Sequence, residues 1–138
     1  MQEIQDLIHR YADAVCRFDG AQWQSTWAPD GVWDMGRTKV EGRETIGETW
    51  TSIMSGIPQV FHVYYNGTAD LDEDAGTGTG RWYVGEFLHM PDGSTVAMYG
   101  FYDDEYVRVE GEWLFHTRLL TPLYRGAADM SGDFLLKH

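Results

Sequence analysis

His62 lies in the middle of a stretch whose composition favours a β-strand. Residues 60–65 are rich in β-branched and aromatic side chains, which fit a pleated, half-buried surface. A neutral imidazole costs little free energy in such surroundings, and its charge can change near physiological pH. His62 can therefore act as a general base if a pocket opens in front of it. The alternative is a core histidine that is hydrogen-bonded to a backbone carbonyl.

Glu86 is a second side chain that could bring a reactive group to a pocket. It has the same strand parity as Trp82 and Val84, which places a carboxylate either inside a pocket or, alternatively, in solvent. No set of His, Cys, Asp and Glu residues has the spacing of metal ligands, and no glycine-rich phosphate loop precedes a helix. We therefore expect neither a metal nor another cofactor.

The composition limits the partners and the location of the chain. Its 138 residues suffice for one domain, and an aromatic content of 14% is typical of proteins with apolar binding pockets. The net charge of -12 disfavours nucleic acid and anionic membrane surfaces, and it favours neutral or cationic small molecules. The chain begins with polar residues, has no apolar run that could cross a bilayer, and has a single cysteine. These features predict a cytoplasmic protein that binds a small molecule.

The first third of the chain has the pattern of helices. Apolar residues recur at helical spacing from residue 4 to 18, which predicts an amphipathic helix. Asp19 and Gln22 resemble a capping box before a short second helix containing Trp23 and Trp27. A turn at 29–31 and a strand at 32–35 should follow. A third helix should then begin near residue 42 and end at 56–58.

From residue 59 onward the pattern changes to the period of two that is typical of strands. We predict strands at 59–71, 77–89, 94–109 and 113–120, joined by tight turns. Helices followed by antiparallel strands indicate an α+β fold. Three N-terminal helices should pack on a strongly curved, mostly antiparallel sheet, forming a cone that can hold a ligand. The domain should span residues 1–124, followed by a tail at 125–138.

Several segments, in this order along the chain, resemble a known family. They are Trp-Ala-Pro-Asp-Gly-Val-Trp at 27–33, Val-Glu-Gly-Arg-Glu-Thr-Ile-Gly at 40–47, His-Val-Tyr-Tyr-Asn at 62–66, Gly-Phe-Tyr-Asp-Asp-Glu-Tyr at 100–106 and Gly-Glu-Trp-Leu-Phe at 111–115. The chain resembles the SnoaL-like branch of the NTF2-like, or cystatin-like, superfamily. This branch contains scytalone dehydratase, hexachlorocyclohexane dehydrochlorinase and bile acid 7α-dehydratase. The superfamily also contains isomerases, hydrolases and non-enzymatic binders, so the fold alone does not determine the function.

The resemblance implies a mechanism that needs no cofactor. In these lyases a strand histidine, oriented by a carboxylate from the first helix, removes a proton while a leaving group departs from the neighbouring carbon. His62 matches that histidine. Arg118 and Tyr102 match polar groups that can stabilise the departing anion, and Trp33 and Tyr11 match pocket aromatics. Trp33 and Tyr102 could instead be plain core residues, and Arg118 could form a solvated ion pair.

Cys16 is where the chain departs from the family. The first-helix aspartate of the family falls on Cys16, and Asp19 matches a second aspartate that caps the next helix. We therefore expect the usual aspartate–histidine pair to be absent. Cys16 could be a pocket wall, a weak hydrogen-bond partner or a thiolate beside a charged His62. An inert thiol is the favoured interpretation, because buried free cysteines usually behave as small hydrophobes.

We predict a cofactor-independent lyase of the dehydratase type that acts on a hydrophobic cyclic or aromatic small molecule. His62, Arg118 and Tyr102 are the expected catalytic groups. The expected substrate pocket consists of Tyr11, Cys16, Trp33, Trp82 and Glu86. One alternative is an isomerase or hydrolase that uses Glu86 or Asp34, and another is a non-catalytic ligand-binding protein. The aromatic residues of 81–84 cannot all be buried in a small cone, so we also expect a homodimer or homotrimer.

Overall fold

Three helices lie in the first part of the chain, in a computed structural model that describes residues 1–129 and 132–135. They are α1 (Gln2–Arg17), α2 (Gly20–Ser25) and α3 (Arg43–Met54). Helix α1 is followed by its C-cap residue Phe18, whose backbone is left-handed (φ 56°). Asp19 then caps α2 by accepting a hydrogen bond from the Gln22 amide, as predicted. No helix in the described part of the chain combines the length and apolar character needed to cross a membrane.

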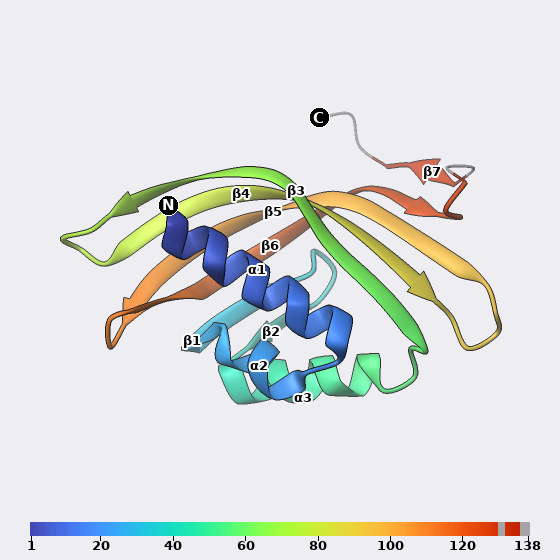
Figure 1. Cartoon of the computed structure of the whole chain (residues 1–138), viewed down its shortest axis with the longest axis horizontal. Helices are drawn as coiled ribbons and strands as arrows, with labels where there is room; N and C mark the ends of the chain where they lie inside the picture. Colours follow the sequence, from blue (N-terminus) through green and yellow to red (C-terminus); the bar gives the residue numbers. More distant parts are fainter. Residues whose placement is uncertain (130–131, 136–138) are drawn as a thin grey trace.

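A single sheet contains all the strands that the structure describes. They are β1 (Trp27–Asp34), β2 (Lys39–Glu41), β3 (Gln59–Asp72), β4 (Thr77–His89), β5 (Thr95–Val109), β6 (Glu112–Gly126) and β7 (Asp133–Phe134). The strand order is β2-β1-β6-β5-β4-β3, with β7 also paired to β6. Only the β1–β6 pair is parallel among the described strands. The predicted α+β fold with a mostly antiparallel sheet is confirmed, and Figure 1 shows the long strands bending together.

The structure corrects the predicted elements in four places. Trp27 begins β1 instead of belonging to α2, because the Thr26 hydroxyl bonds back to Trp23 and the Phe115 amide bonds to the Thr26 carbonyl. The segment 29–31 lies within β1, where the register against β6 shifts, and is not a separate turn. Strand β2 was not predicted, and β6 continues to Gly126 instead of ending at residue 120. Part of the predicted 125–138 tail lies outside the described residues.

Two bulges interrupt the pairing of β6 with β5. At the first, Tyr106 and Glu105 pair with Phe115 and Thr117, so that β6 contains one extra residue, His116. At the second, Gly100 and Tyr99 pair with Pro122 and Tyr124, and Leu123 is the extra residue. An extra residue reverses which face of the sheet the following side chains occupy. In β6, even-numbered residues that face one side of the sheet before a bulge therefore face the other side after it, and the same holds for odd-numbered residues.

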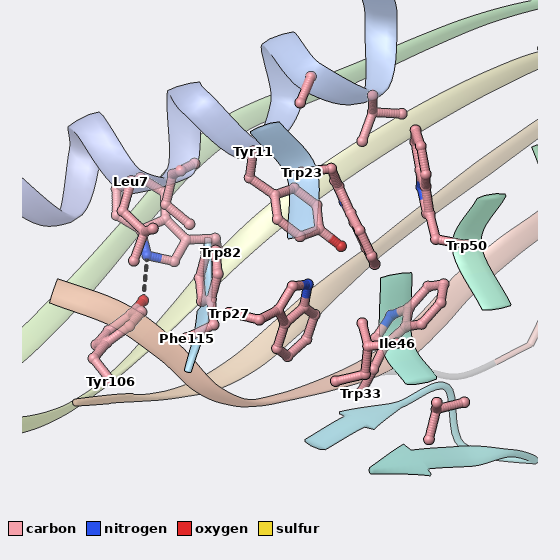
Figure 2. Packing of buried hydrophobic residues seen from close by; sticks show 14 of the residues in the cluster. Leu7, Tyr11, Trp23, Trp27, Trp33, Ile46, Trp50, Trp82, Tyr106 and Phe115 are labelled. Carbon is pink, nitrogen blue, oxygen red and sulfur yellow. Dashed lines mark hydrogen bonds between the residues drawn. The ribbon is translucent and has the colours of Figure 1, made fainter. Parts of the chain in front are cut away.

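The main core lies between the helices and one face of the sheet. It combines Tyr11 of α1, Trp23 of α2, Trp50 of α3 and Phe115 of β6, all of them buried. Trp23 and Trp50 are stacked with their ring centroids 5.0 Å apart, and the ring centroids of Tyr11 and Trp23 are 5.3 Å apart. Figure 2 shows Tyr11 descending from α1 among these rings. The helices thus supply one wall of the space in front of the sheet.

Candidate functional site

His62 and Glu86 form the central pair of the candidate site. They lie opposite each other on β3 and β4, and His62 Nδ1 is 2.6 Å from Glu86 Oε2. His62 is only 4% exposed, while the Glu86 side chain is 25% exposed. A carboxylate accepts from the Nδ1–H group, so this contact favours the tautomer whose Nε2 carries the lone pair. A carboxylate in this position also stabilises an imidazolium.

Tyr64 occupies the other nitrogen of His62. Its hydroxyl is 2.9 Å from His62 Nε2 and accepts a hydrogen bond of 2.7 Å from Arg118 NH1. Burial raises the pKa of Tyr64 well above its usual value, although Arg118 opposes this, so the hydroxyl stays neutral and can donate to His62. Both nitrogens of His62 are therefore engaged in the free protein.

Arg118 is held in place by a buried carboxylate. Its Nε and NH2 groups donate to Asp104 Oδ1 at 2.7 Å and to Oδ2 at 3.2 Å, and both side chains are 0% exposed. Burial alone would lower the pKa of Arg118, but the negative charge of Asp104, together with the neighbouring hydroxyls of Tyr64, Tyr11 and Tyr102, outweighs burial and raises the pKa. Tyr106 also donates to Asp104 at 2.9 Å, and Trp82 donates to Tyr106 at 2.9 Å (dashed in Figure 2). An unbroken chain of hydrogen bonds thus runs from Trp82 to Glu86.

Aromatic rings surround the Arg118 guanidinium. Its central carbon lies 3.9 Å from the Tyr102 ring, 4.1 Å from Phe115 and 4.6 Å from Tyr11. A cation over an aromatic face is attracted by the ring quadrupole, and this attraction strengthens where water is excluded. Burial raises the pKa of Tyr102 well above its usual value, so its hydroxyl is a neutral hydrogen-bond donor.

A cavity of about 330 Å³ opens beside His62 and Glu86. Its size is near the lower end of the range for small-molecule pockets. Its walls come from α1, β1, α3 and strands β3 to β6. They consist of Tyr11, Val15, Trp33, Met35, Trp50, Ile53, Met54, His62, Glu86, Leu88, Met90, Val96, Met98, Tyr102, Leu120 and Arg125. Most of this lining is apolar, so the cavity suits a hydrophobic ligand with a few polar groups.

Five of the predicted site residues line this cavity, namely Tyr11, Trp33, His62, Glu86 and Tyr102. The other three predicted residues have different positions. Arg118 lies behind the wall, and its ion pair with Asp104 is buried instead of solvated. The first bulge of β6 turns it to the core face, which the simple alternation with His116 did not predict. Trp82 lies in the core with its indole bonded to Tyr106.

Cys16 contacts the backbone of His62 and not its ring. The Cys16 sulfur is 3.3 Å from the His62 amide nitrogen and 3.6 Å from the His62 carbonyl oxygen. Cys16 thus joins the end of α1 to β3. The carboxylate on the His62 ring comes instead from β4, through Glu86. The alternative carboxylate, Asp34, accepts a hydrogen bond from the Gly36 amide in the turn after β1.

Tyr64 and Asp104 take part in this network but were not predicted from the sequence. Tyr64 follows His62 by two residues on the same strand, and this shared parity could have identified it. Asp104 shares its strand parity with Tyr102 and Tyr106, and this could have distinguished it from Asp103. Its contact with Arg118 depends on the pairing of β5 with β6, where the two residues lie opposite each other.

Three larger depressions lie elsewhere on the protein, with volumes of about 680, 490 and 470 Å³. The largest contains His116 and Asp30, but their contact of 3.5 Å is longer than the 2.6 Å contact of His62 with Glu86, and the Asp30 side chain is 80% exposed. No group of three or more His, Cys, Asp or Glu residues among those described could hold a metal ion. The smaller cavity therefore combines enclosure with reactive groups.

The chain is similar to a known domain family and to several solved structures. The sequence profile of the SnoaL-like domain matches residues 1–119. The fold is similar to a putative scytalone dehydratase from Novosphingobium aromaticivorans, with a TM-score of 0.86, 17% identity, and coverage of 100% of this chain and 93% of that chain. It is also similar to a hexachlorocyclohexane dehydrochlorinase from Novosphingobium barchaimii, with a TM-score of 0.80, 18% identity, and coverage of 99% and 94%.

A protein of unknown function with a cystatin-like fold from Nostoc punctiforme gives a TM-score of 0.71, with 16% identity over 88% of this chain and 89% of that chain. At such identities these likenesses show the fold alone. A comparison with curated proteins found no match.

Proposed function

The chain belongs to the SnoaL-like domain family, and from this premise we propose that it is a cofactor-independent lyase acting on a hydrophobic cyclic or aromatic small molecule. The observation that supports the proposal is the His62–Glu86 contact of 2.6 Å at the wall of an apolar cavity. A histidine whose Nδ1–H is held by a carboxylate is a good proton acceptor at Nε2. Most side chains that line the cavity are apolar, which disfavours water beside the reacting groups.

In the proposed reaction the substrate replaces the Tyr64 hydroxyl at His62 Nε2. The imidazole takes a proton from a substrate carbon, and the electron pair of the broken C–H bond forms a double bond to the neighbouring carbon. The leaving group departs from that carbon with its own bonding pair. A hydroxyl leaving group departs as water after it receives the proton that the His62 imidazolium has taken from carbon, and the neutral Tyr102 hydroxyl at the wall can donate a hydrogen bond to it. Glu86 stabilises the imidazolium, and Arg118 holds the displaced Tyr64 hydroxyl.

A second candidate function is isomerisation with Glu86 as the base. Glu86 lines the cavity, and only its Oε2 atom is hydrogen-bonded among the described residues. The other oxygen could remove a proton and return it to a different carbon. Isomerisation releases no leaving group, which distinguishes it from elimination.

Incubation with cyclic β-hydroxyketones in deuterated water tests the proposal. The lyase should form the unsaturated ketone, which proton NMR detects together with any hydrogen–deuterium exchange at the acidic carbon. Exchange with formation of an isomer, but with no loss of the hydroxyl group, would instead support the isomerase. Saturable binding with no exchange and no product for any member of the series would indicate a ligand-binding protein.

A comparison of Glu86→Gln with Cys16→Ser distinguishes the role of the carboxylate that bonds the His62 ring from the role of the thiol that contacts the His62 backbone. Glu86→Gln removes the charge that stabilises the imidazolium, so we expect kcat to fall by at least roughly tenfold. Cys16→Ser keeps a small polar group beside the His62 amide and should change kcat by less than about threefold, within the usual effect of a substitution that preserves shape. Steady-state kinetics on the same substrate compares the two variants. A greater loss in Cys16→Ser, together with inactivation by a thiol reagent, would assign the chemistry to the cysteine.

The outer face of the sheet supports the proposal that the protein is a homodimer or homotrimer. Phe61, Val63 and Tyr65 alternate along β3 and are 58%, 42% and 58% exposed. Exposed apolar side chains that gather on one strand are typical of a protein interface. Light scattering at micromolar concentration should give a multiple of the chain mass, and Phe61→Asp should lower it. A monomeric mass for the unaltered protein would contradict this assembly.

A further inference from the structure

One wall of the cavity contains a cation that the proposed proton transfer does not use. Arg125 lies near the end of β6, is exposed and lines the cavity. Among the residues that the structure describes, its side chain has neither a hydrogen bond nor an ion pair, unlike Arg81, Arg108 and Arg118. Arg125 also lies beyond residues 1–119, which match the family profile, so its presence does not follow from the family assignment.

The strand register places Arg125 in one row with the reactive pair. His62 on β3 lies opposite Glu86 on β4, Glu86 lies opposite Met98 on β5, and Met98 lies opposite Arg125 on β6. Neighbouring strands are about 4.8 Å apart, so the backbones of Glu86 and Arg125 are separated by about 10 Å along this row. An aromatic ring system with one short substituent can span this distance. Between the two ends the wall is apolar, because Met98 and Leu120 occupy it.

Trp33 provides a second donor without an acceptor. Its indole Nε1 is buried and has no hydrogen-bond partner among the described residues, and the residue lines the cavity. The indole nitrogens of Trp23 and Trp27 are in the same state within the described part of the chain, but these two residues do not line the cavity. A buried donor without an acceptor costs free energy, which a ligand oxygen would recover.

We propose that the substrate is an aromatic or cyclic carboxylic acid, whose carboxylate binds Arg125 while its ring fills the cavity and its reacting carbon reaches His62. This inference rests on the proposed function in taking the cavity as the substrate site. The net charge of -12 repels anions at long range, but salt screens it beyond about 8 Å at physiological ionic strength. Asp133, which pairs with Arg125 across β6 and β7, is exposed and forms no ion pair with it, so the guanidinium is available.

Calorimetric titration with naphthoate and naphthamide of the same substitution pattern tests this inference without turnover. The two probes share shape and ring system and differ in charge. The unaltered protein should bind naphthoate roughly tenfold more tightly, as expected for one hydrogen-bonded charge pair. Arg125→Gln should abolish this preference by weakening the binding of naphthoate without changing that of naphthamide. Arg81→Gln removes the same charge from the opposite face of the sheet, since residue 81 alternates with Trp82, and should keep the preference.

Equal affinity for the two probes, a preference that survives in Arg125→Gln, or no binding of either probe at millimolar concentration would each overturn the inference. The result of this binding test can be distinguished from the result of the elimination test of the proposed function. An Arg125-dependent preference for the acid with no elimination on any substrate would support the acid site and refute the lyase. Elimination that proceeds equally well on uncharged substrates and in Arg125→Gln would support the lyase and refute the acid site.

Discussion

His62→Gln should reduce turnover by roughly 10²–10⁴-fold, the usual contribution of a general base. Glutamine can keep a hydrogen bond to Glu86 or to Tyr64, but it cannot accept a proton from carbon at neutral pH. The loss should appear in kcat, because the side chain contributes little to the apolar lining that holds the substrate. Steady-state kinetics and the rate of hydrogen–deuterium exchange into substrate both measure it.

His9→Gln is the matched control for this experiment. His9 is exposed on α1, so its replacement should change neither kcat nor the exchange rate. Circular dichroism should show that both variants keep the native fold. If His62→Gln retained more than about a tenth of the activity, the base would have to be another group, and Glu86 would be the next candidate.

Asp104→Asn should lower the free energy of unfolding by about 3–5 kcal/mol, the largest stability loss that we expect from one substitution. The change leaves the Arg118 guanidinium at 0% exposure without a counter-charge. The carboxylate accepts hydrogen bonds from both Arg118 and Tyr106, so two donors lose their charged partner. Urea unfolding followed by tryptophan fluorescence measures the difference.

Asp103→Asn gives a control of the same chemistry one residue away. Asp103 pairs with Arg81 in a similar two-bond geometry, at 2.7 and 3.0 Å, but both side chains are more than 40% exposed. Exposed pairs typically contribute no more than about 1 kcal/mol, so this variant should unfold almost like the native protein. Equal losses at Asp103 and Asp104 would show that burial is not what makes the inner pair important.

Much of the fold follows from local patterns in the sequence. The change from helical to strand periodicity after Pro58 predicts the α+β order, and the turns at 90–93 and 110–112 set the long hairpins. The position of His62 on a strand and the core-facing parity of Glu86 also follow from alternation. The contact between them depends on which strands pair, and that was not part of the prediction.

The position of Arg118 could not be predicted in the same way. Alternation with His116 and Leu114 makes it a candidate for a solvated ion pair, yet the bulge at His116 turns it inward. A bulge inserts one residue without a distinctive composition, so periodicity in one strand does not reveal it. The partner strand reveals it, because Asp104 and Arg118 are opposite each other only in the shifted register.

The bulges of β6 have a consequence for how such a protein could evolve. Each cation near the cavity, Arg118 and Arg125, follows one extra residue in the strand. Deletion of Leu123 would remove the second bulge and still leave Arg125 opposite Met98, on the cavity face. If the bulge were lost with every residue kept, Tyr124 would lie opposite Met98 and Arg125 would turn to the outer face. A shift of one residue in the pairing of β6 with β5 would therefore replace the cationic end of the cavity by an aromatic one, with no change of residue type. Changes in strand register, and not only point substitutions, are thus an evolutionary route to new substrate preferences on this scaffold.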